Sequence, residues 1–225
     1  MREKIAGYPL PQGCTINGNI INFSECVPEE KKCELLLYKK GTTEPQEIIK
    51  LEKDGATGTL RYATFVMPDW NKYEYNFRIN DEIALDPYGK AFAGREHFGV
   101  PRDITLGEVR TKIVQDDFDW EGDKPLRLAE NEIIAYSLHV RGFTKHSSSK
   151  LKKKGTFAGL IEKIPYLQEL GINQIQCMPV YDFEENLKYT NYWGYGDGYF
   201  FAPKAGYAAG DPVQEMKQMV KLLHK

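Results

Sequence analysis

A stretch near the C-terminal end of the chain combines aromatic rings, glycines and one acid. Residues 191–203 read NYWGYGDGYFFAP and hold six aromatic residues, three glycines and the carboxylate of Asp197. Glycines at this density break helical and strand patterns, so a loop is predicted. Aromatic rings stack on the apolar C–H faces of sugars, and covering about 60 Å² of such a face contributes roughly 1.5 kcal/mol. The residue types indicate either a carbohydrate-facing surface or an Ω-loop packed on its own aromatics.

This stretch belongs to a longer segment, residues 181–210, for which the sequence predicts no regular secondary structure. Loops of such length are uncommon in compact domains, and those that occur are usually functional or disordered. Disordered segments contain few aromatic residues. We therefore expect an ordered loop, which is either a ligand-facing surface or a buried plug.

The elements before this loop are predicted to form a βαβ unit. Residues 133–140 are a mostly apolar run suited to a buried strand, and residues 174–180 are predicted to be a second strand. Residues 157–170 have a helical period that Pro165 is expected to break, and Gly171 is suited to end the helix. A strand, a helix and a strand at this spacing indicate parallel strands joined by a right-handed crossover.

A further helix is predicted from Pro212 onwards, with Asp211 as its N-cap and Gln214 at the third position of a capping box. Its apolar stripe consists of Val213, Met216, Val220 and Leu223. The βαβ unit places His139 and Arg141 at the end of the first strand. It also places Asp182 just after the second strand.

The first hundred residues are predicted to form an antiparallel β-sandwich. Short β-rich runs alternate there with Gly, Pro, Asn and Asp turn residues. The strands are expected at residues 19–23, 33–38, 46–51, 59–66, 73–79 and 82–85. Trp70 and Tyr73 are candidates for glycan contact, but we favour the alternative that they pack in the core or at its edge.

Residues 98–131 are predicted to be an extended connector anchored by Phe118 and Trp120. Its acidic run, residues 116–119, lacks the alternating oxygen ligands and turn glycine of a calcium site, so a solvated acidic face is favoured. The basic run at residues 145–154 has no interleaved aromatic residues and is interpreted as a solvated loop, not as a nucleic-acid site.

Composition excludes several other classes of protein. The chain has 225 residues and a net charge of −2, so no general attraction to nucleic acid or membranes is implied. No apolar run approaches a membrane span, and the N-terminus has no apolar core of a signal peptide. The cysteines form no C-x-x-C pair, so zinc and other cofactors are not expected. Reduced thiols and the missing signal favour a cytoplasmic protein. The cysteines are Cys14, Cys26, Cys33 and Cys177.

The aromatic stretch resembles a segment of the α-amylase superfamily (glycoside hydrolase family 13). In its isoamylase-type and glycogen-debranching members, N-Y-W-G-Y and then F-x-P follow the second barrel strand. Pullulanases have Y-N-W-G-Y-D-P, and Gly196 and Asp197 replace the Asp-Pro here, which favours the isoamylase-like group. Other segments resemble the family in the same order: LDPYGKA at 85–91, DFDWEGDKPL at 117–126, AYSLHVRGFT at 135–144, GTFAGL at 155–160 and MPVYDF at 178–183.

The resemblance implies a multi-domain fold. Residues 1–100 would be an all-β Ig-like sandwich, similar to carbohydrate-binding module family 48, and residues 101–131 a linker. Residues 132–225 would be the first βα units of an incomplete (β/α)₈ barrel. Such a barrel would leave an open strand edge through which the chain could self-associate.

The resemblance also implies a function for the parent enzyme, a glycosidase that hydrolyses α-1,6 branch linkages in glycogen-like α-glucans. The family's catalytic carboxylates follow later barrel strands, so Asp182 and Asp197 inherit no catalytic role and this chain alone is expected to be inactive. The substrate-binding residues would be Tyr195, which stacks on the sugar, with Trp193, Asp197 and His139. The alternative function is a non-catalytic α-glucan-binding or scaffold protein.

Overall fold

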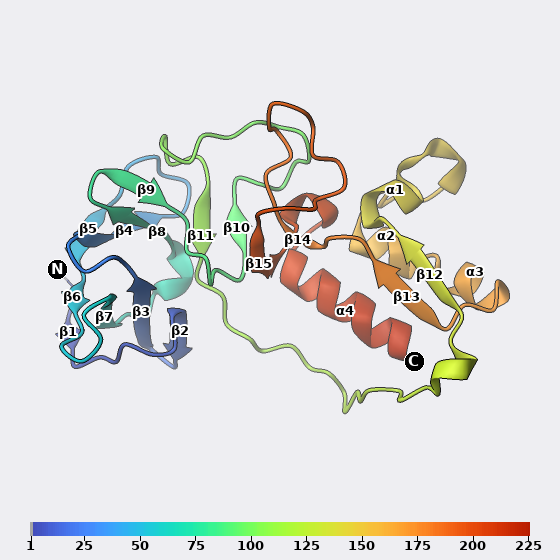
Figure 1. Ribbon diagram of the computed structural model, residues 1–225, viewed down its shortest axis with the longest axis horizontal. Helices are drawn as coiled ribbons and strands as arrows, with labels where there is room; N and C mark the ends of the chain where they lie inside the picture. Colours follow the sequence, from blue (N-terminus) through green and yellow to red (C-terminus); the bar gives the residue numbers. More distant parts are fainter. Residues whose placement is uncertain (1) are drawn as a thin grey trace. The chain divides into compact units, whose positions relative to one another are not determined.

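The computed structural model describes residues 2–225, and the chain is rich in β-structure with few helices (Figure 1). It divides into two compact units. The first unit contains the residues up to Gly94, Pro101–Gln115 and Tyr199–Ala202. The second unit contains Arg95–Val100, Asp116–Gly198 and Pro203–Lys225.

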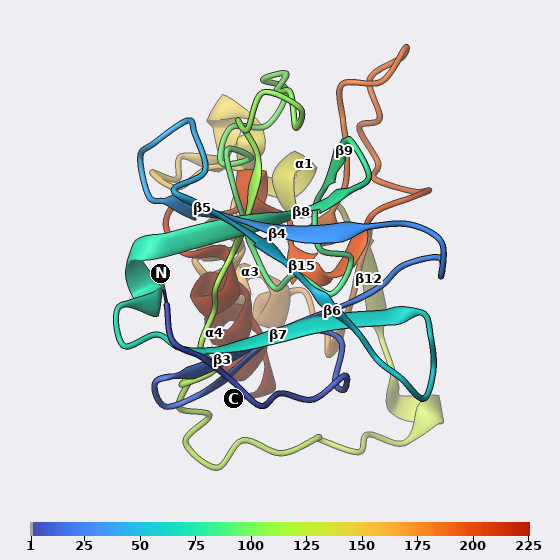
Figure 2. The same cartoon turned by 90° about the vertical axis from the view of Figure 1, so that its left-hand side faces the viewer.

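The first unit consists of two antiparallel sheets, which Figure 2 shows as two layers of strands. One sheet has the order β1-β7-β3-β2, with β6 also on β7, and the other has the order β10-β11-β8-β4-β5, with β9 also on β8. A short 3₁₀ helix, Trp70–Lys72, precedes β8. The strands are β1 Lys4–Ile5, β2 Gly13–Asn17, β3 Ile20–Cys26, β4 Cys33–Lys39, β5 Glu47–Lys50, β6 Glu52–Lys53, β7 Leu60–Val66, β8 Tyr73–Ile79, β9 Glu82–Ala84, β10 Phe92–Ala93 and β11 Arg110–Lys112.

The core of the first unit lies between these sheets because apolar residues alternate with polar ones along the strands. On β3, Ile21 and Phe23 are fully buried in this core. The Phe23 ring meets the Tyr75 ring of β8 in the other sheet, with 4.9 Å between ring centroids. Trp70 and Tyr73 also pack in or against the core, as favoured from sequence.

All six strands predicted between residues 19 and 85 are present, as β3, β4, β5, β7, β8 and β9. The sequence did not predict the short strands β1, β2, β6, β10 and β11. One of these, β11, lies within the stretch predicted to be a connector, where Thr111 pairs with Tyr75 of β8.

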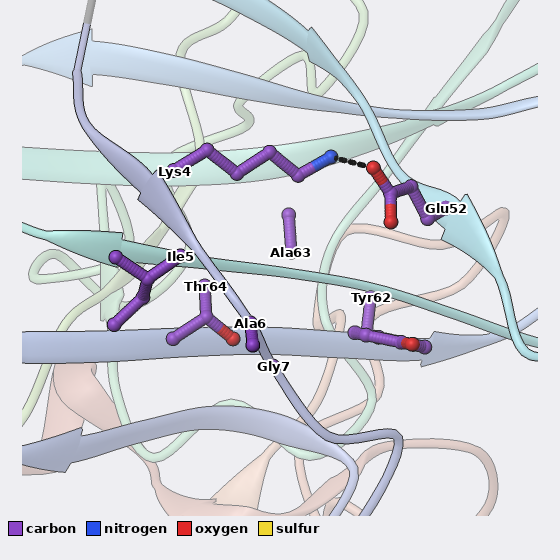
Figure 3. A pocket seen from close by; sticks show the side chains of 8 residues that line it. All are labelled: Lys4, Ile5, Ala6, Gly7, Glu52, Tyr62, Ala63 and Thr64. Carbon is purple, nitrogen blue, oxygen red and sulfur yellow. Dashed lines mark hydrogen bonds and ion pairs between the residues drawn. The ribbon is translucent and has the colours of Figure 1, made fainter.

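One edge of β7 is shared by two short strands. β1 pairs with Thr64 and Phe65, and β6 pairs with Arg61 and Tyr62. Figure 3 shows the ion pair between Lys4 and Glu52 that connects these two strands. A depression of about 450 Å³ lies beside it, lined by Lys4, Ile5, Ala6, Gly7, Glu52, Tyr62, Ala63 and Thr64.

The second unit contains the predicted βαβ arrangement. Its two strands, β12 (Ala135–Leu138) and β13 (Gln174–Cys177), are parallel and lie side by side in Figure 1. The other elements of this unit are η2 Glu130–Glu132, α1 Val140–Lys145, η3 Ser147–Ser149, α2 Phe157–Ile161, α3 Ile164–Glu169, β14 Tyr181–Asp182, η4 Ala205–Tyr207 and α4 Pro212–His224. β15, Tyr199–Pro203, has its first four residues in the first unit. The elements β14, β15 and η4 correct the expectation that residues 181–210 have no regular secondary structure. Its core consists of Leu138, Val140, Phe157, Leu160, Phe183, Tyr207 and Met219.

The predicted helix signals are confirmed. The helical segment is broken before Pro165, so that α2 and α3 are separate helices. Gly171 follows α3 with a φ of 78°, the left-handed conformation that commonly ends a helix. Asp211 caps α4 by accepting a hydrogen bond from the Gln214 N–H at 2.9 Å.

The first strand of this unit ends earlier than predicted, at Leu138 instead of Val140. The cause is a local cap, because His139 Nδ1 accepts a hydrogen bond from the Gly142 N–H and thereby begins α1. His139 is therefore the N-cap of a helix, and Arg141 lies within that helix.

The acids of the run at residues 116–119 are exposed, as expected of a solvated face, and ion pairs join this run and the residues after it to α4. Lys221 of α4 bonds to Glu121 at 3.0 Å, and its ammonium lies 4.9 Å from the Phe118 ring centroid. Further ion pairs join Asp116 to Lys217, Asp123 to His224 and Glu121 to Lys225. Phe118 thus anchors the segment as predicted, whereas Trp120 is 36% exposed.

Within residues 2–225, none of the helices has the length and apolar character of a membrane span. In the same part of the chain, no three side chains of His, Cys, Asp or Glu are grouped so that they could hold a metal ion.

Candidate substrate-binding site

The aromatic loop, defined here as residues 183–198, presents three rings to solvent. The side chains of Tyr189, Trp193 and Tyr195 are 78%, 52% and 65% exposed. Large rings held in solvent are unusual unless they bind a ligand or a partner, because their burial would be favourable. The remaining aromatics of the motif, Tyr199 to Phe201, belong to the first unit.

The exposed Trp193 contacts an aromatic cluster that reaches the core of the second unit. The Tyr192 ring stacks on the His139 imidazole with 4.5 Å between centroids and 9° between planes. The edge of Trp193 contacts both rings, at 5.4 Å from Tyr192 and 6.0 Å from His139. Tyr207, which is fully buried, lies 5.3 Å from His139 on the other side. The loop therefore rests on an aromatic cluster continuous with the core of the second unit.

His139 is 5% exposed, and both ring nitrogens are engaged. Nδ1 accepts from the Gly142 N–H, so the ring proton is on Nε2, which donates to the Tyr192 carbonyl at 2.9 Å and lies 3.0 Å from the Tyr207 hydroxyl. Burial lowers the pKa of His139, which keeps the ring neutral. In this arrangement His139 fixes the backbone of the loop, and its predicted contact with substrate stays a prediction.

The backbone of Tyr195 is held by Asn191. The Asn191 Oδ1 accepts from the Gly194 N–H at 3.0 Å, and its Nδ2 donates to the Tyr195 carbonyl at 3.3 Å. Gly194 has a φ of 84°, and a Cβ there would lie 2.4 Å from the ring of buried Phe183. The turn therefore packs tightly against the core, and the Tyr195 side chain points away from these constraints into solvent.

A cluster of charged side chains is buried beneath the loop. Lys204 is fully buried and donates to the Phe183 carbonyl at 2.6 Å and to Glu185 Oε2 at 2.5 Å. Arg95 lies 3.5 Å from Asp182 and 3.1 Å from Glu184. Burial is the main cause that raises the pKa of Asp182 to about 6, and the positive charges of Lys204 and Arg95 oppose this shift.

The structure brings together only some of the predicted site residues. Trp193 and His139 are in contact, and Tyr195 and Asp197 follow in the exposed part of the loop. Asp182 is fully buried whereas Asp197 is exposed, so these two acids do not face solvent as a pair. The structure does not assign either of them a chemical step.

Sequence reasoning missed Lys204, Glu185 and Arg95. A lysine or a glutamate is almost never fully buried unless it is paired, and the partner here lies 19 positions away in the chain. No local sequence pattern predicts an ion pair between residues so far apart. The available signal for a role in the site was that all three residues lie close in sequence to the aromatic motif or to the strand ends.

Comparison with known proteins relates the chain to a set of glucan-debranching enzymes, although no protein-family model matches it. It is 32% identical to "Isoamylase 1, chloroplastic" of Arabidopsis thaliana, over 97% of this chain and 33% of that protein. It is also 32% identical to "Glycogen operon protein GlgX homolog" of Mycobacterium tuberculosis, over 97% of this chain and 36% of that protein. The chain thus spans about a third of the length of the curated relatives it matches.

Solved structures show the same fold. Apo pullulanase from Paenibacillus barengoltzii superposes with a TM-score of 0.77 at 22% identity, covering 96% of this chain and 36% of that one. Pullulanase type I from Bacillus subtilis, complexed with maltose, gives a TM-score of 0.74 at 23% identity, covering 97% and 32%. In each case the match covers nearly all of this chain.

Proposed function

The chain belongs with the isoamylases, glycogen-debranching enzymes and pullulanases of the α-amylase superfamily, whose N-terminal part it matches, and we propose that its parent protein hydrolyses α-1,6 branch linkages in glycogen- or starch-type α-glucans. One observation carries the role of this chain in that reaction. Trp193 and Tyr195 present exposed rings on a loop whose backbone is fixed by buried groups. Rigid aromatic platforms of this kind suit the flat faces of glucose units.

The finer architecture follows the same proposal. The first unit would be an Ig-like sandwich of the carbohydrate-binding type, supported by its two antiparallel sheets around one core. The second unit would be the first βα units of a (β/α)₈ barrel, supported by the parallel pair β12 and β13. In such barrels the active site lies at the C-terminal ends of the strands, and the aromatic loop follows β13 and β14 in the chain.

In this proposal the chain supplies substrate binding, not bond cleavage. Tyr195 would stack on the sugar at the cleavage subsite, with Trp193 and Asp197 at its side and His139 beneath the loop. The nucleophile and the acid/base would come from later strands of the parent protein. The chain by itself is therefore expected to release no reducing sugar from pullulan or glycogen.

Binding of maltohexaose to the 225-residue chain, followed by tryptophan fluorescence and calorimetry, tests the proposal. Tyr195→Ala is expected to weaken binding about tenfold, because the loss of a stacking face costs roughly 1.5 kcal/mol. Tyr166→Ala is the matched control, since Tyr166 is also exposed, at 46%, but lies on α3. Equal affinities of the wild type and Tyr195→Ala would contradict the assigned subsite.

The alternative, a non-catalytic α-glucan-binding or scaffold protein, predicts the same binding without hydrolysis. The coding sequence beyond Lys225 separates the two. A continuing frame that encodes further strands with acidic ends supports the hydrolase, and a stop codon supports the binding protein.

Two further statements belong to the proposal. A reducing compartment, the cytoplasm, suits a chain whose four cysteines are free thiols, and localisation of a tagged parent protein tests this.

Self-association is supported by an apolar groove of about 470 Å³ between α3, α4 and β13 and by the two-stranded sheet β12-β13. Sedimentation of the chain as a monomer at high concentration would contradict self-association.

A further inference from the structure

Four contacts connect a buried ammonium group to the backbone of Tyr195. Lys204 Nζ bonds to Glu185 Oε2 at 2.5 Å, and the Glu185 carbonyl accepts from the Asn191 N–H at 3.0 Å. The Asn191 side chain then accepts from the Gly194 N–H and donates to the Tyr195 carbonyl, at 3.0 and 3.3 Å. The sequence of bonds therefore runs from the interior of the second unit to the exposed ring.

Lys204 is an unusual residue for the interior. Its side chain has no exposed surface, and besides Glu185 it reaches the Phe183 carbonyl at 2.6 Å and lies 4.4 Å from the Phe183 ring centroid. Burying an ammonium is unfavourable unless it is paired and hydrogen-bonded. All the partners of Lys204 named here lie at the start of the aromatic loop, so its charge favours the conformation in which that start is folded onto it.

Glu185 extends the constraint to a second segment. Its Oε1 accepts from the Gly99 N–H at 2.8 Å, while its Oε2 faces Lys204. Both carboxylate oxygens are thus used, and the side chain is buried. Because its main-chain carbonyl holds Asn191, displacement of the Glu185 side chain would release the turn that carries Tyr195.

We propose that Lys204, acting through Glu185 and Asn191, is a positioning residue that fixes the pose of Tyr195 for glucan binding. This proposal rests on the function proposed above for Tyr195. It requires an energetic dependence of Tyr195 on Lys204, although the two side chains have no direct contact in the bonds described. Lys204 itself would touch neither the sugar nor the reacting atoms.

A double-mutant cycle between Lys204→Met and Tyr195→Ala tests this dependence. Lys204→Met is expected to weaken maltohexaose binding by the 225-residue chain about tenfold in the wild-type background and by less than about twofold in the Tyr195→Ala background. A residue with a merely structural role would give the same loss in both backgrounds. Equal losses in the two backgrounds would overturn the proposal.

Amide hydrogen exchange gives a readout that needs no ligand. The Asn191 and Gly194 amides are held by the bonds described, so Lys204→Met is expected to speed their exchange at least about tenfold while the β12 and β13 amides stay protected. Lys188→Met is the matched control, because Lys188 lies in the same loop but is exposed. Unchanged exchange at Asn191 and Gly194 in a folded Lys204→Met protein would also overturn the proposal.

The two measurements separate this proposal from the proposed function. If the wild-type chain binds no maltohexaose, the glucan subsite fails, but hydrogen exchange still decides whether Lys204 holds the loop. If Lys204→Met does not fold, Lys204→Gln, which keeps a donor of similar reach, takes its place. The expected changes then have the same pattern at smaller size, and their absence counts against the proposal.

Discussion

The two units differ in how they bury Glu185 and Glu25. In the second unit, Asp182 and Glu185 lie beside the cations Arg95 and Lys204. In the first unit, Glu25 and Asp86 are buried near each other, and Glu25 Oε2 has no hydrogen-bond partner among the described residues. Burial, and then the charge of Asp86, raise the pKa of Glu25 to about 8. The second unit places cations beside its buried acids, whereas in the first unit Glu25 is buried without a cation bonded to it and its pKa is raised.

The difference indicates where each unit needs a fixed geometry. Ion pairs and charge-assisted hydrogen bonds are directional, and in the second unit they hold the segment that carries the exposed rings. In the first unit, Asp86 Oδ2 accepts from the neutral Tyr75 hydroxyl at 2.5 Å, and the buried Glu74 lies 3.8 Å from Arg110. The cations Lys204 and Arg95 of the second unit are thus placed at the start of the aromatic loop.

The largest effect on stability is expected when the buried ion pair of Lys204 and Glu185 in the second unit is broken. Lys204→Met should lower the free energy of unfolding by about 4 kcal/mol, because it leaves Glu185 buried without its cation. Adding Glu185→Leu to the same chain should recover most of that loss, since both charges are then removed together. Urea unfolding monitored by tryptophan fluorescence measures both, and equal stability of the single and double variants would contradict compensation.

The first unit should respond to pH over a higher range than the second, because the pKa of Glu25 is raised further than that of Asp182. The folded state raises the pKa of Glu25 from its ordinary value of 4.5 to about 8, so the folded chain keeps a proton that the unfolded chain has lost. Stability should therefore fall as pH rises from about 4.5 to about 8 and stay level above that range.

Glu25→Gln, which keeps the shape without the charge, should remove the slope between about pH 6 and about pH 8 and stabilise the chain by roughly 3 kcal/mol at pH 9. Below about pH 6 a slope should remain, because the pKa of Asp182 is also raised, to about 6. Urea unfolding at several pH values measures the effect. Glu29→Gln is the control, because Glu29 is exposed. A slope that persists unchanged in Glu25→Gln would place the titrating group elsewhere.

The part of the fold that can be predicted from the sequence differs between these regions for physical reasons. The sequence predicts the strand Tyr73–Ile79 with its observed ends, because the alternation of apolar and polar residues is a local signal. It does not predict that the polar residues Glu74 and Asn76 are buried as well. The cap at Asp211 is equally local. By contrast, β1 has two residues and exists only through its pairing with β7, which no local pattern encodes.

The sequence predicts the exposed residues of the candidate site, but it does not predict the buried residues that hold them in place. The N-Y-W-G-Y motif identified Tyr195 and Trp193, which are exposed in the structure. A lysine is expected at the surface unless it is paired. The partner that allows Lys204 to be buried lies far away in the chain, so the local sequence does not predict its burial. His139 was expected at a strand end, but its ring caps a helix instead.

A smaller effect tests how closely the aromatic loop must pack on the second unit. Gly194 and Gly196 both have positive φ, 84° and 119°, but a Cβ at Gly194 would strike the Phe183 ring whereas a Cβ at Gly196 would meet nothing. Gly194→Ala should therefore cost about 2 kcal/mol of stability, and Gly196→Ala about 1 kcal/mol from backbone strain alone. Thermal unfolding of the two variants measures the difference, and equal losses would show that packing on Phe183 does not constrain the turn.

The smallest expected effect concerns what Tyr195 offers once it is positioned. Its ring is 65% exposed, and its backbone, not its side chain, makes the bond to Asn191. Tyr195→Phe keeps the ring face and removes only the hydroxyl, so maltohexaose affinity should change by less than about twofold, against about tenfold for Tyr195→Ala. In the parent enzyme, kcat/KM should follow the same order, because stacking that holds the transition-state geometry is lost only with the ring. Calorimetry with both variants measures the difference. If Tyr195→Phe lowers the affinity as much as Tyr195→Ala does, the Tyr195 hydroxyl binds the sugar through a hydrogen bond and the stacking role is wrong.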